Sequence, residues 1–135
     1  MTLETQMRAA VQAYFDLFNA GDGAGIAALF ADDAQVIDPV GTDPKSGKTA
    51  ISEFYAMATR SGSTLERTGP TRIADKSAAF AFKVHVKGIK PEDTAIDVDL
   101  PTGAMVIDVI DVFDFNDDGK ISQMRAYWGP YNISQ

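Results

Sequence analysis

The stretch that decides the fold is Val106-Ile107-Asp108-Val109-Ile110-Asp111-Val112-Phe113-Asp114-Phe115. Successive side chains of a β-strand point to opposite faces of the sheet. One face of this predicted strand is apolar apart from a single acid, in the series Ile107, Val109, Asp111, Phe113 and Phe115. The other face mixes acids with apolar residues. Ionising Asp111 among apolar neighbours is costly, so we expect its pKa to be raised.

Two further segments supply apolar faces of the same kind. The first face is made of Phe80, Phe82, Val84 and Val86, and the second of Met124, Ala126 and Trp128. The intervening residues point the other way; among them are Lys83, His85 and Arg125. Turn signals at Gly69-Pro70, Gly88 and residues 116–119 separate the predicted strands. Brought together in one sheet, these faces would line a hydrophobic cavity.

The N-terminal half has helical spacing instead. Apolar residues recur every three or four positions over Met7–Asn19 and Thr49–Arg60, and Asp22 can cap another helix that runs to about Phe30. A short strand is predicted at Ala34–Asp38 and ends before Pro39. Helices followed by strands predict an α+β domain, in which three N-terminal helices cover one face of a strongly curved antiparallel sheet and leave a cup between the layers.

Composition narrows the class of protein. A chain of 135 residues that is 45% hydrophobic fits one domain, residues 1–135. The net charge of −7, with scattered basic residues, argues against a nucleic-acid partner. The chain has no cysteine and one histidine, so we expect neither disulfides nor a metal site, and we interpret His85 as a surface residue without a partner. No long apolar run or secretory signal is evident, so we expect no membrane span and a cytoplasmic location.

Three polar residues are candidates for chemistry, and each has a simpler explanation. Asp111 could reach solvent at a bulge in its strand. Tyr14 could be a core tyrosine with its hydroxyl at an edge. Asp38, which precedes Pro39, could merely form a turn. The functional interpretation rests on the three residues together.

Several segments occur in an order that is shared with a known family. They are Tyr14 with Asn19-Ala20-Gly21-Asp22, the run 31–41 with Asp38-Pro39, Ile51-Ser52-Glu53-Phe54-Tyr55, Val109-Ile110-Asp111-Val112-Phe113 and Met124-Arg125-Ala126-Tyr127-Trp128. Together they resemble the bacterial Δ5-3-ketosteroid isomerases, cone-shaped proteins of the nuclear-transport-factor-2-like (NTF2-like) superfamily. The resemblance covers nearly the whole chain outside Lys87–Gly103. That segment is longer than in well-known members, and it could rim the pocket.

The resemblance implies a role for each polar residue. Asp38 matches the general base, which moves a proton from C4 to C6 of a 3-oxo-Δ5-steroid through a dienolate. Tyr14 and Asp111 match the oxyanion hole, and Tyr55 matches the tyrosine that holds Tyr14 in place. No cofactor is implied. We assign the wall that binds the steroid-like molecule to Phe54, Phe80, Phe82, Val84, Val109, Met124 and Trp128. The resemblance also implies a homodimer, which would cover the outer sheet face.

Other functions remain open, because the superfamily also hosts epoxide hydrolases, cyclases, dehydratases and binding proteins. A SnoaL-like polyketide cyclase would use Asp38 on a different enolisable carbonyl. A limonene-type epoxide hydrolase would need an Asp-Arg-Asp set, and Arg125 points away from Met124 and Trp128 on its strand. A non-catalytic carrier would use the same polar residues to anchor a hydroxyl or carbonyl group of a hydrophobic ligand.

Overall fold

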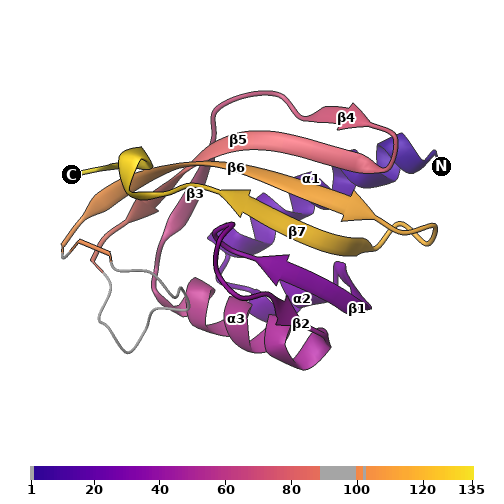
Figure 1. Cartoon of the computed structure of the whole chain (residues 1–135), viewed down its shortest axis with the longest axis horizontal. Coiled ribbons are helices and arrows are strands. Elements are labelled where there is room, and N and C mark those ends of the chain that lie inside the picture. The colour runs from indigo at the N-terminus through magenta and orange to yellow at the C-terminus, as the bar shows by residue number, and fades with distance from the viewer. Residues whose placement is uncertain (1, 89–99, 102) are drawn as a thin grey trace.

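The computed structural model describes residues 2–88, 100–101 and 103–135. Within them, the helices are α1 (Leu3–Asn19), α2 (Gly23–Ala27) and α3 (Lys48–Arg60). The strands are β1 (Phe30–Ile37), β2 (Lys45–Ser46), β3 (Thr64–Arg67), β4 (Arg72–Ala74), β5 (Ser77–Val86), β6 (Met105–Phe115), β7 (Ile121–Tyr127) and β8 (Ile133–Ser134), and a short 3-10 helix η2 covers Pro130–Asn132. The helices lie on one side of the sheet (Figure 1), which confirms the α+β class.

The strands form one mixed sheet in the order β2-β1-β7-β6-β5-β3, with β4 added to β5 and β8 added to β6. Most neighbours are antiparallel, but β1 pairs with β7 in parallel. The prediction of an entirely antiparallel sheet was therefore wrong for this pair. Alternation of side chains determines which face of a strand is buried, but it carries no information about the direction of a neighbour that is distant in the chain.

The boundary between α2 and β1 also differs from the prediction. Helix α2 ends at Ala27 and β1 begins at Phe30, whereas the sequence predicted a helix to about Phe30 and a strand from Ala34. Lys48 explains the early end of the helix, because its Nζ donates to the carbonyl oxygens of Ala27 and Phe30 at 2.8 and 2.6 Å. These bonds satisfy the last carbonyl group of α2 and the first of β1, so one side chain holds the helix end and the start of the strand together.

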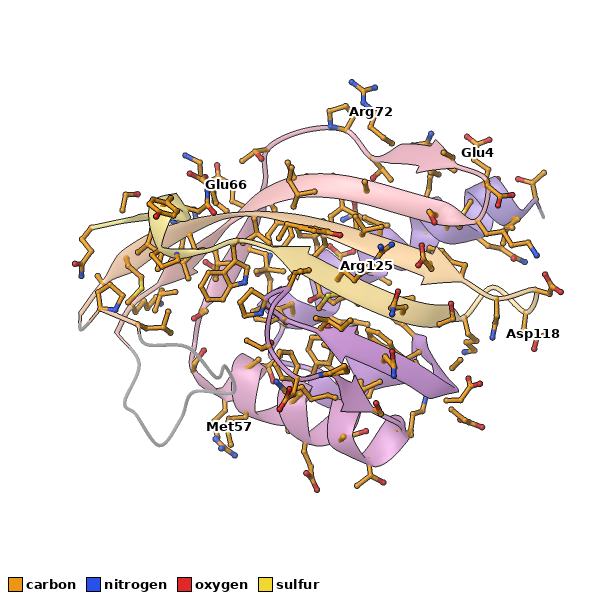
Figure 2. All side chains as sticks on the ribbon, in the orientation of Figure 1. Glu4, Met57, Glu66, Arg72, Asp118 and Arg125 are labelled. Atoms are coloured by element: carbon orange, nitrogen blue, oxygen red, sulfur yellow. The ribbon has the colours of Figure 1, made fainter. Side chains whose placement is uncertain are left out.

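The core lies between the helices and the inner face of the sheet. On β6 the predicted alternation is confirmed: Ile107, Val109 and Asp111 are buried, whereas Asp108 and Ile110 are exposed. Charged side chains such as those labelled on Glu4, Glu66, Arg72 and Asp118 lie at the periphery (Figure 2). Among the helices of the described residues, none has the length and apolar character required to cross a membrane.

Gly23 allows α2 to pack closely against α3. A Cβ at this position would lie 2.8 Å from the Tyr55 carbonyl oxygen and 2.9 Å from the Ala56 nitrogen, which are backbone atoms with little freedom to move. We expect Gly23→Ala to lower the free energy of unfolding by about 1–3 kcal/mol, despite the better helix propensity of alanine. Urea denaturation would measure this change. Gly69→Ala is the control, because a Cβ there meets no atom within 4 Å; equal stability of the two variants would refute this explanation.

Candidate active site

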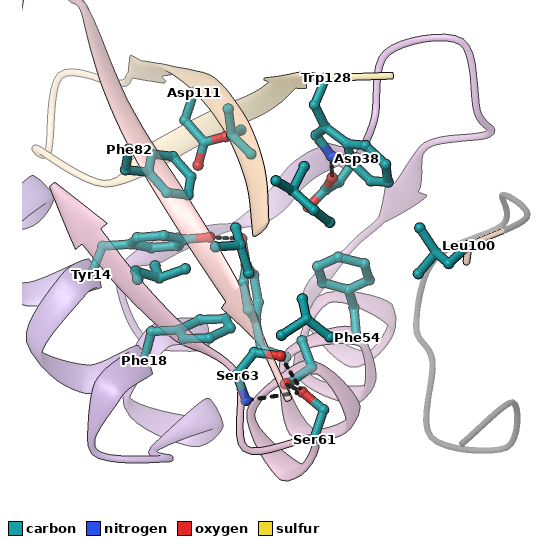
Figure 3. A pocket seen from close by; sticks show the side chains of 17 residues that line it. Tyr14, Phe18, Asp38, Phe54, Ser61, Ser63, Phe82, Leu100, Asp111 and Trp128 are labelled. Carbon is teal, nitrogen blue, oxygen red and sulfur yellow. Dashed lines mark hydrogen bonds between the residues drawn. The ribbon is translucent and has the colours of Figure 1, made fainter. Parts of the chain in front are cut away.

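A pocket opens between α1, α3 and the strands β5 and β6 (Figure 3). Its empty volume is about 730 Å³, including the space at its open side. The apolar part of the lining is Phe18, Phe54, Ala58, Leu65, Phe82, Val84, Val86, Leu100, Ile107 and Val109. The polar part is Tyr14, Asp38, Tyr55, Ser61, Ser63, Asp111 and Trp128. A cavity of this kind suits a hydrophobic molecule that carries a few polar groups.

The structure brings all four predicted polar residues, Tyr14, Asp38, Tyr55 and Asp111, to this one pocket. Among the predicted wall residues, five border it: Phe54, Phe82, Val84, Val109 and Trp128. The other two, Phe80 and Met124, are buried in the core and do not appear in the lining formed by the described residues.

The strand register explains why Phe80 and Met124 are not in the lining. The pocket lies at the end of the sheet where Phe82 of β5 pairs with Val109 of β6. Met124 lies opposite Phe113, and Phe80 packs edge-on against the Phe113 ring at 4.9 Å between ring centres. Alternation places these side chains on the correct face, but their position along the strands places them in the core beside the pocket.

Tyr14 on α1 and Tyr55 on α3 form a buried pair. Their hydroxyl oxygens lie 3.1 Å apart, and the side chains are 4% and 1% exposed. Aromatic packing holds Tyr14, because its ring meets those of Phe113 and Tyr55 edge-on at 5.1 and 5.8 Å. Burial is the main cause that raises the pKa of both tyrosines well above the usual value, and the nearby charge of Asp111 adds to it, although the hydrogen bond with Tyr14 lowers the pKa of Tyr55. Both hydroxyls therefore stay protonated at neutral pH, so a proton is available for donation to a ligand.

Asp111 on β6 is a buried acid without a visible partner. Its side chain is 1% exposed, and its Oδ2 atom has no hydrogen-bond partner among the described residues. Burial, with a smaller contribution from the charge of Asp38, raises the pKa of Asp111 well above its usual value. A neutral carboxyl group has an O–H donor, so Asp111 can donate a hydrogen bond to a ligand in the pocket.

Asp38 follows directly after β1 and has a different environment. Its Oδ1 accepts a hydrogen bond from Nε1 of Trp128 at 2.8 Å. The pKa of Asp38 is raised overall by burial, and the Trp128 bond and the positive charge of Lys45 oppose this rise. The Asp38 carboxylate is thus stabilised by two groups that Asp111 lacks. This difference favours an ionised Asp38 beside a neutral Asp111, the combination of a base with an acid.

Sequence reasoning missed several residues of the site. Ile107 shares a strand face with Asp111, so the alternation of β6 could have identified it. The bond between Trp128 and Asp38 depends on the parallel pairing of β1 with β7, for which the sequence carried no signal. The segment that was expected to rim the pocket, 87–103, falls mostly on residues 89–99 and 102, which lie outside the described residues; Leu100 borders the pocket.

The profile of the SnoaL-like domain family matches residues 11–124. The chain belongs to the SnoaL-like family. It is 36% identical over 128 residues to the Steroid Delta-isomerase of Nocardioides simplex, a match that covers 95% of this chain and 94% of that protein. The resemblance of the sequence to the steroid isomerases is thereby confirmed.

This SnoaL-like chain is also similar to enzymes of another activity. It is 30% identical over 129 residues to the Epoxide hydrolase LasB of Streptomyces lasalocidi, and it spans 43% of that protein's length. A solved structure of SalBIII, an epoxide hydrolase/cyclase-like enzyme with a role in pyran ring formation in the polyether salinomycin, superimposes with a TM-score of 0.82. That match has 29% identity and covers 97% of this chain and 96% of the other.

Two charged residues of this SnoaL-like domain lie away from the pocket. Arg125 donates to Asp114 Oδ2 at 3.1 Å on the opposite face of the sheet, as the alternation of β7 predicts. His85 is a surface residue as expected, but its predicted lack of a partner was wrong, because its Nε2 lies 2.8 Å from Glu66 Oε1. The pairing of β3 with β5 brings these two side chains together.

Among the described residues, no group of three or more acidic or histidine side chains is arranged to hold a metal ion.

The buried acid of this SnoaL-like pocket makes stability depend on pH. Because the pKa of Asp111 is raised in the folded state, the unfolded chain loses this proton first as the pH rises above about 4. The folded state then loses about 1.4 kcal/mol per pH unit until its own carboxyl ionises. We therefore expect Asp111→Asn to gain stability over the wild type as the pH rises from 4 to 8. Urea denaturation across this range measures the difference, with Asp108→Asn on the exposed face of β6 as control. A difference that does not change with pH would argue against a neutral Asp111.

Proposed function

We propose that this protein is a Δ5-3-ketosteroid isomerase, which moves a proton from C4 to C6 of a 3-oxo-Δ5-steroid through a dienolate. The observation that carries the proposal is the contrast between two acids in one apolar pocket. Asp38 has an N–H donor and a nearby cation, whereas the buried Asp111 oxygen has no partner among the described residues. The 36% identity to a Steroid Delta-isomerase over nearly the full length of both chains supports the same activity.

In the proposed reaction, Asp38 is the base. Its carboxylate takes a proton from C4, the C4–H electron pair forms the C3=C4 double bond, and the carbonyl becomes an oxyanion. The proton then returns from Asp38 to C6, while C3=O reforms and the remaining double bond lies between C4 and C5. The Trp128 bond occupies Oδ1 of Asp38, so Oδ2 is the oxygen that is free to carry the proton.

Tyr14 and Asp111 would stabilise the oxyanion by donating hydrogen bonds to it. Both groups are held protonated by burial, and both line the pocket. With the Tyr14 proton directed at the ligand, the Tyr55 hydroxyl is left to donate to Tyr14 across their 3.1 Å separation. Donors that are fixed before the reaction, in a site from which water is excluded, favour the transition state over the bound substrate.

A second candidate is an acid–base cyclisation or hydrolysis of an epoxide, and the similarity to LasB and SalBIII favours it. In that reaction Asp38 would remove a proton from an attacking hydroxyl or water, and neutral Asp111 would protonate the epoxide oxygen. The pocket lining formed by the described residues contains no arginine, so a set of the Asp-Arg-Asp type receives no support from it.

Binding of a phenolic steroid such as equilenin tests the proposed isomerase site. Its planar phenol resembles the dienolate, so the wild type should bind it tightly, and Asp111→Ala should weaken the binding at least about tenfold through loss of a donor. Asp108→Ala, on the exposed face of the same strand, should leave the affinity unchanged. Fluorescence titration measures all three affinities. Absence of binding, or equal affinities for the wild type and Asp111→Ala, would contradict the proposal.

A further inference from the structure

The pocket contains a second polar group that the proposed reaction does not use. Ser61 and Ser63 both line it, and the Ser63 residue is only 7% exposed. In the view of Figure 3, Ser61 and Ser63 lie at the lower side of the pocket, and Asp111 and Trp128 lie at its upper side. Because Asp111, Ser61 and Ser63 line one pocket, a ligand that contacts Asp111 at one end can contact the serines at its other end.

The end of α3 explains how the serine pair is held. The last carbonyl groups of a helix lack partners within the helix, and the Ser61 hydroxyl donates to the Ala58 carbonyl oxygen at 2.7 Å. Gly62 has a φ of +78°, a conformation that favours glycine, and the chain reverses there. Ser63 Oγ consequently lies 3.0 Å from Ser61 Oγ.

The bond from Ser61 to Ala58 favours one direction for this hydrogen-bond chain. A serine hydroxyl has one proton, and that of Ser61 is used on Ala58. Ser61 Oγ is therefore left to accept, from the Ser63 backbone N–H at 3.4 Å and from the Ser63 hydroxyl at 3.0 Å, and in this arrangement the Ser63 proton is directed at Ser61. The Ser63 hydroxyl has no further partner among the described residues. Its lone pairs remain, so the serine pair presents a hydrogen-bond acceptor to the pocket.

We propose that Ser63 accepts a hydrogen bond from a hydroxyl group of the ligand, at the end distant from the reacting carbonyl. This inference rests on the proposed function for the identity of the reacting end. It defines the substrate class as hydrophobic 3-ketones, steroid-like in shape, with a distal hydroxyl. A distal carbonyl has only lone pairs to offer, and it would leave both oxygens without a donor.

Equilibrium binding of two conjugated 3-ketosteroids tests this assignment without any turnover. Testosterone carries a 17β-hydroxyl, and 4-androstene-3,17-dione carries a 17-carbonyl. The wild type should bind testosterone about 3- to 10-fold more tightly, as expected for one neutral hydrogen bond. Ser63→Ala should bind both steroids with equal affinity. Ser134→Ala, an exposed serine on β8 outside the lining, should keep the preference.

Ser61→Ala provides an independent test of the direction of the chain. Without the Ser61 oxygen, the Ser63 proton becomes free to bond a carbonyl, so the preference for testosterone should disappear or reverse. The inference would be overturned if the wild type bound the two steroids with equal affinity, or if neither steroid bound. A preference that survives Ser63→Ala would overturn it too. If the wild type prefers testosterone but shows no isomerase turnover, the serine site is supported and the proposed function is contradicted. If the wild type turns over substrate but binds both steroids equally, the proposed function is supported and the serine site is contradicted.

Discussion

Asp38→Asn should lower kcat for 5-androstene-3,17-dione by about 10²- to 10⁴-fold, the range typical of a general base. An amide has no carboxylate lone pair of comparable basicity, so the C4 proton has no acceptor at this position. Substrate binding should persist, because the amide has nearly the same shape and can still accept the Trp128 hydrogen bond. Steady-state kinetics and equilibrium binding measure the two effects separately.

Asp33→Asn is the matched control for this variant, because Asp33 is an exposed acid on β1, the strand that Asp38 directly follows. Its kcat should equal that of the wild type. If Asp38→Asn kept more than about a tenth of the wild-type kcat, a different base would be required, since the expected loss is at least about a hundredfold. A carrier without turnover would show no difference between the two variants.

Tyr14→Phe should lower kcat by about 10²- to 10³-fold, the usual effect of losing one oxyanion donor. The bond from Tyr14 strengthens as negative charge develops on the substrate oxygen, so KM should change much less than kcat. The buried ring packing with Phe113 and Tyr55 is kept by phenylalanine, which limits any effect on folding.

Tyr131→Phe serves as the control for the loss of a tyrosine hydroxyl, because Tyr131 is fully exposed on η2. Tyr55→Phe should have a smaller effect than Tyr14→Phe, since Tyr55 acts on the ligand only by positioning Tyr14. Activity of Tyr14→Phe within threefold of the wild type would show that the hydroxyl does not contact the developing charge.

Side-chain alternation was the most informative signal in the sequence. It placed Asp111 on the buried face of β6 and Arg125 on the opposite face of β7, and the structure confirms both placements. The carboxyl group of Asp111 is informative because burial of an acid is costly, and so an acid within an apolar face stands out from its neighbours.

Pairing between distant strands was beyond this kind of reasoning. The parallel contact of β1 with β7 brings Trp128 to Asp38, and no local pattern encodes it. Ser61 and Ser63 were missed because they lie beyond the end of a helix, where spacing carries no signal about a pocket.

Homodimerisation and a cytoplasmic location stay predictions. Ile110 and Tyr127 of the outer sheet face are about half exposed in this single chain, at 49% and 45%.

The most direct measurement mixes the purified wild-type protein with 5-androstene-3,17-dione and follows the ultraviolet absorbance of a conjugated enone. Isomerisation joins the double bond to the 3-carbonyl, so we predict that this band grows rapidly with the wild type and only slowly with Asp38→Asn. If the band grows no faster than in buffer, although the steroid is bound in the pocket, the isomerase proposal is contradicted and epoxide chemistry becomes the function to test.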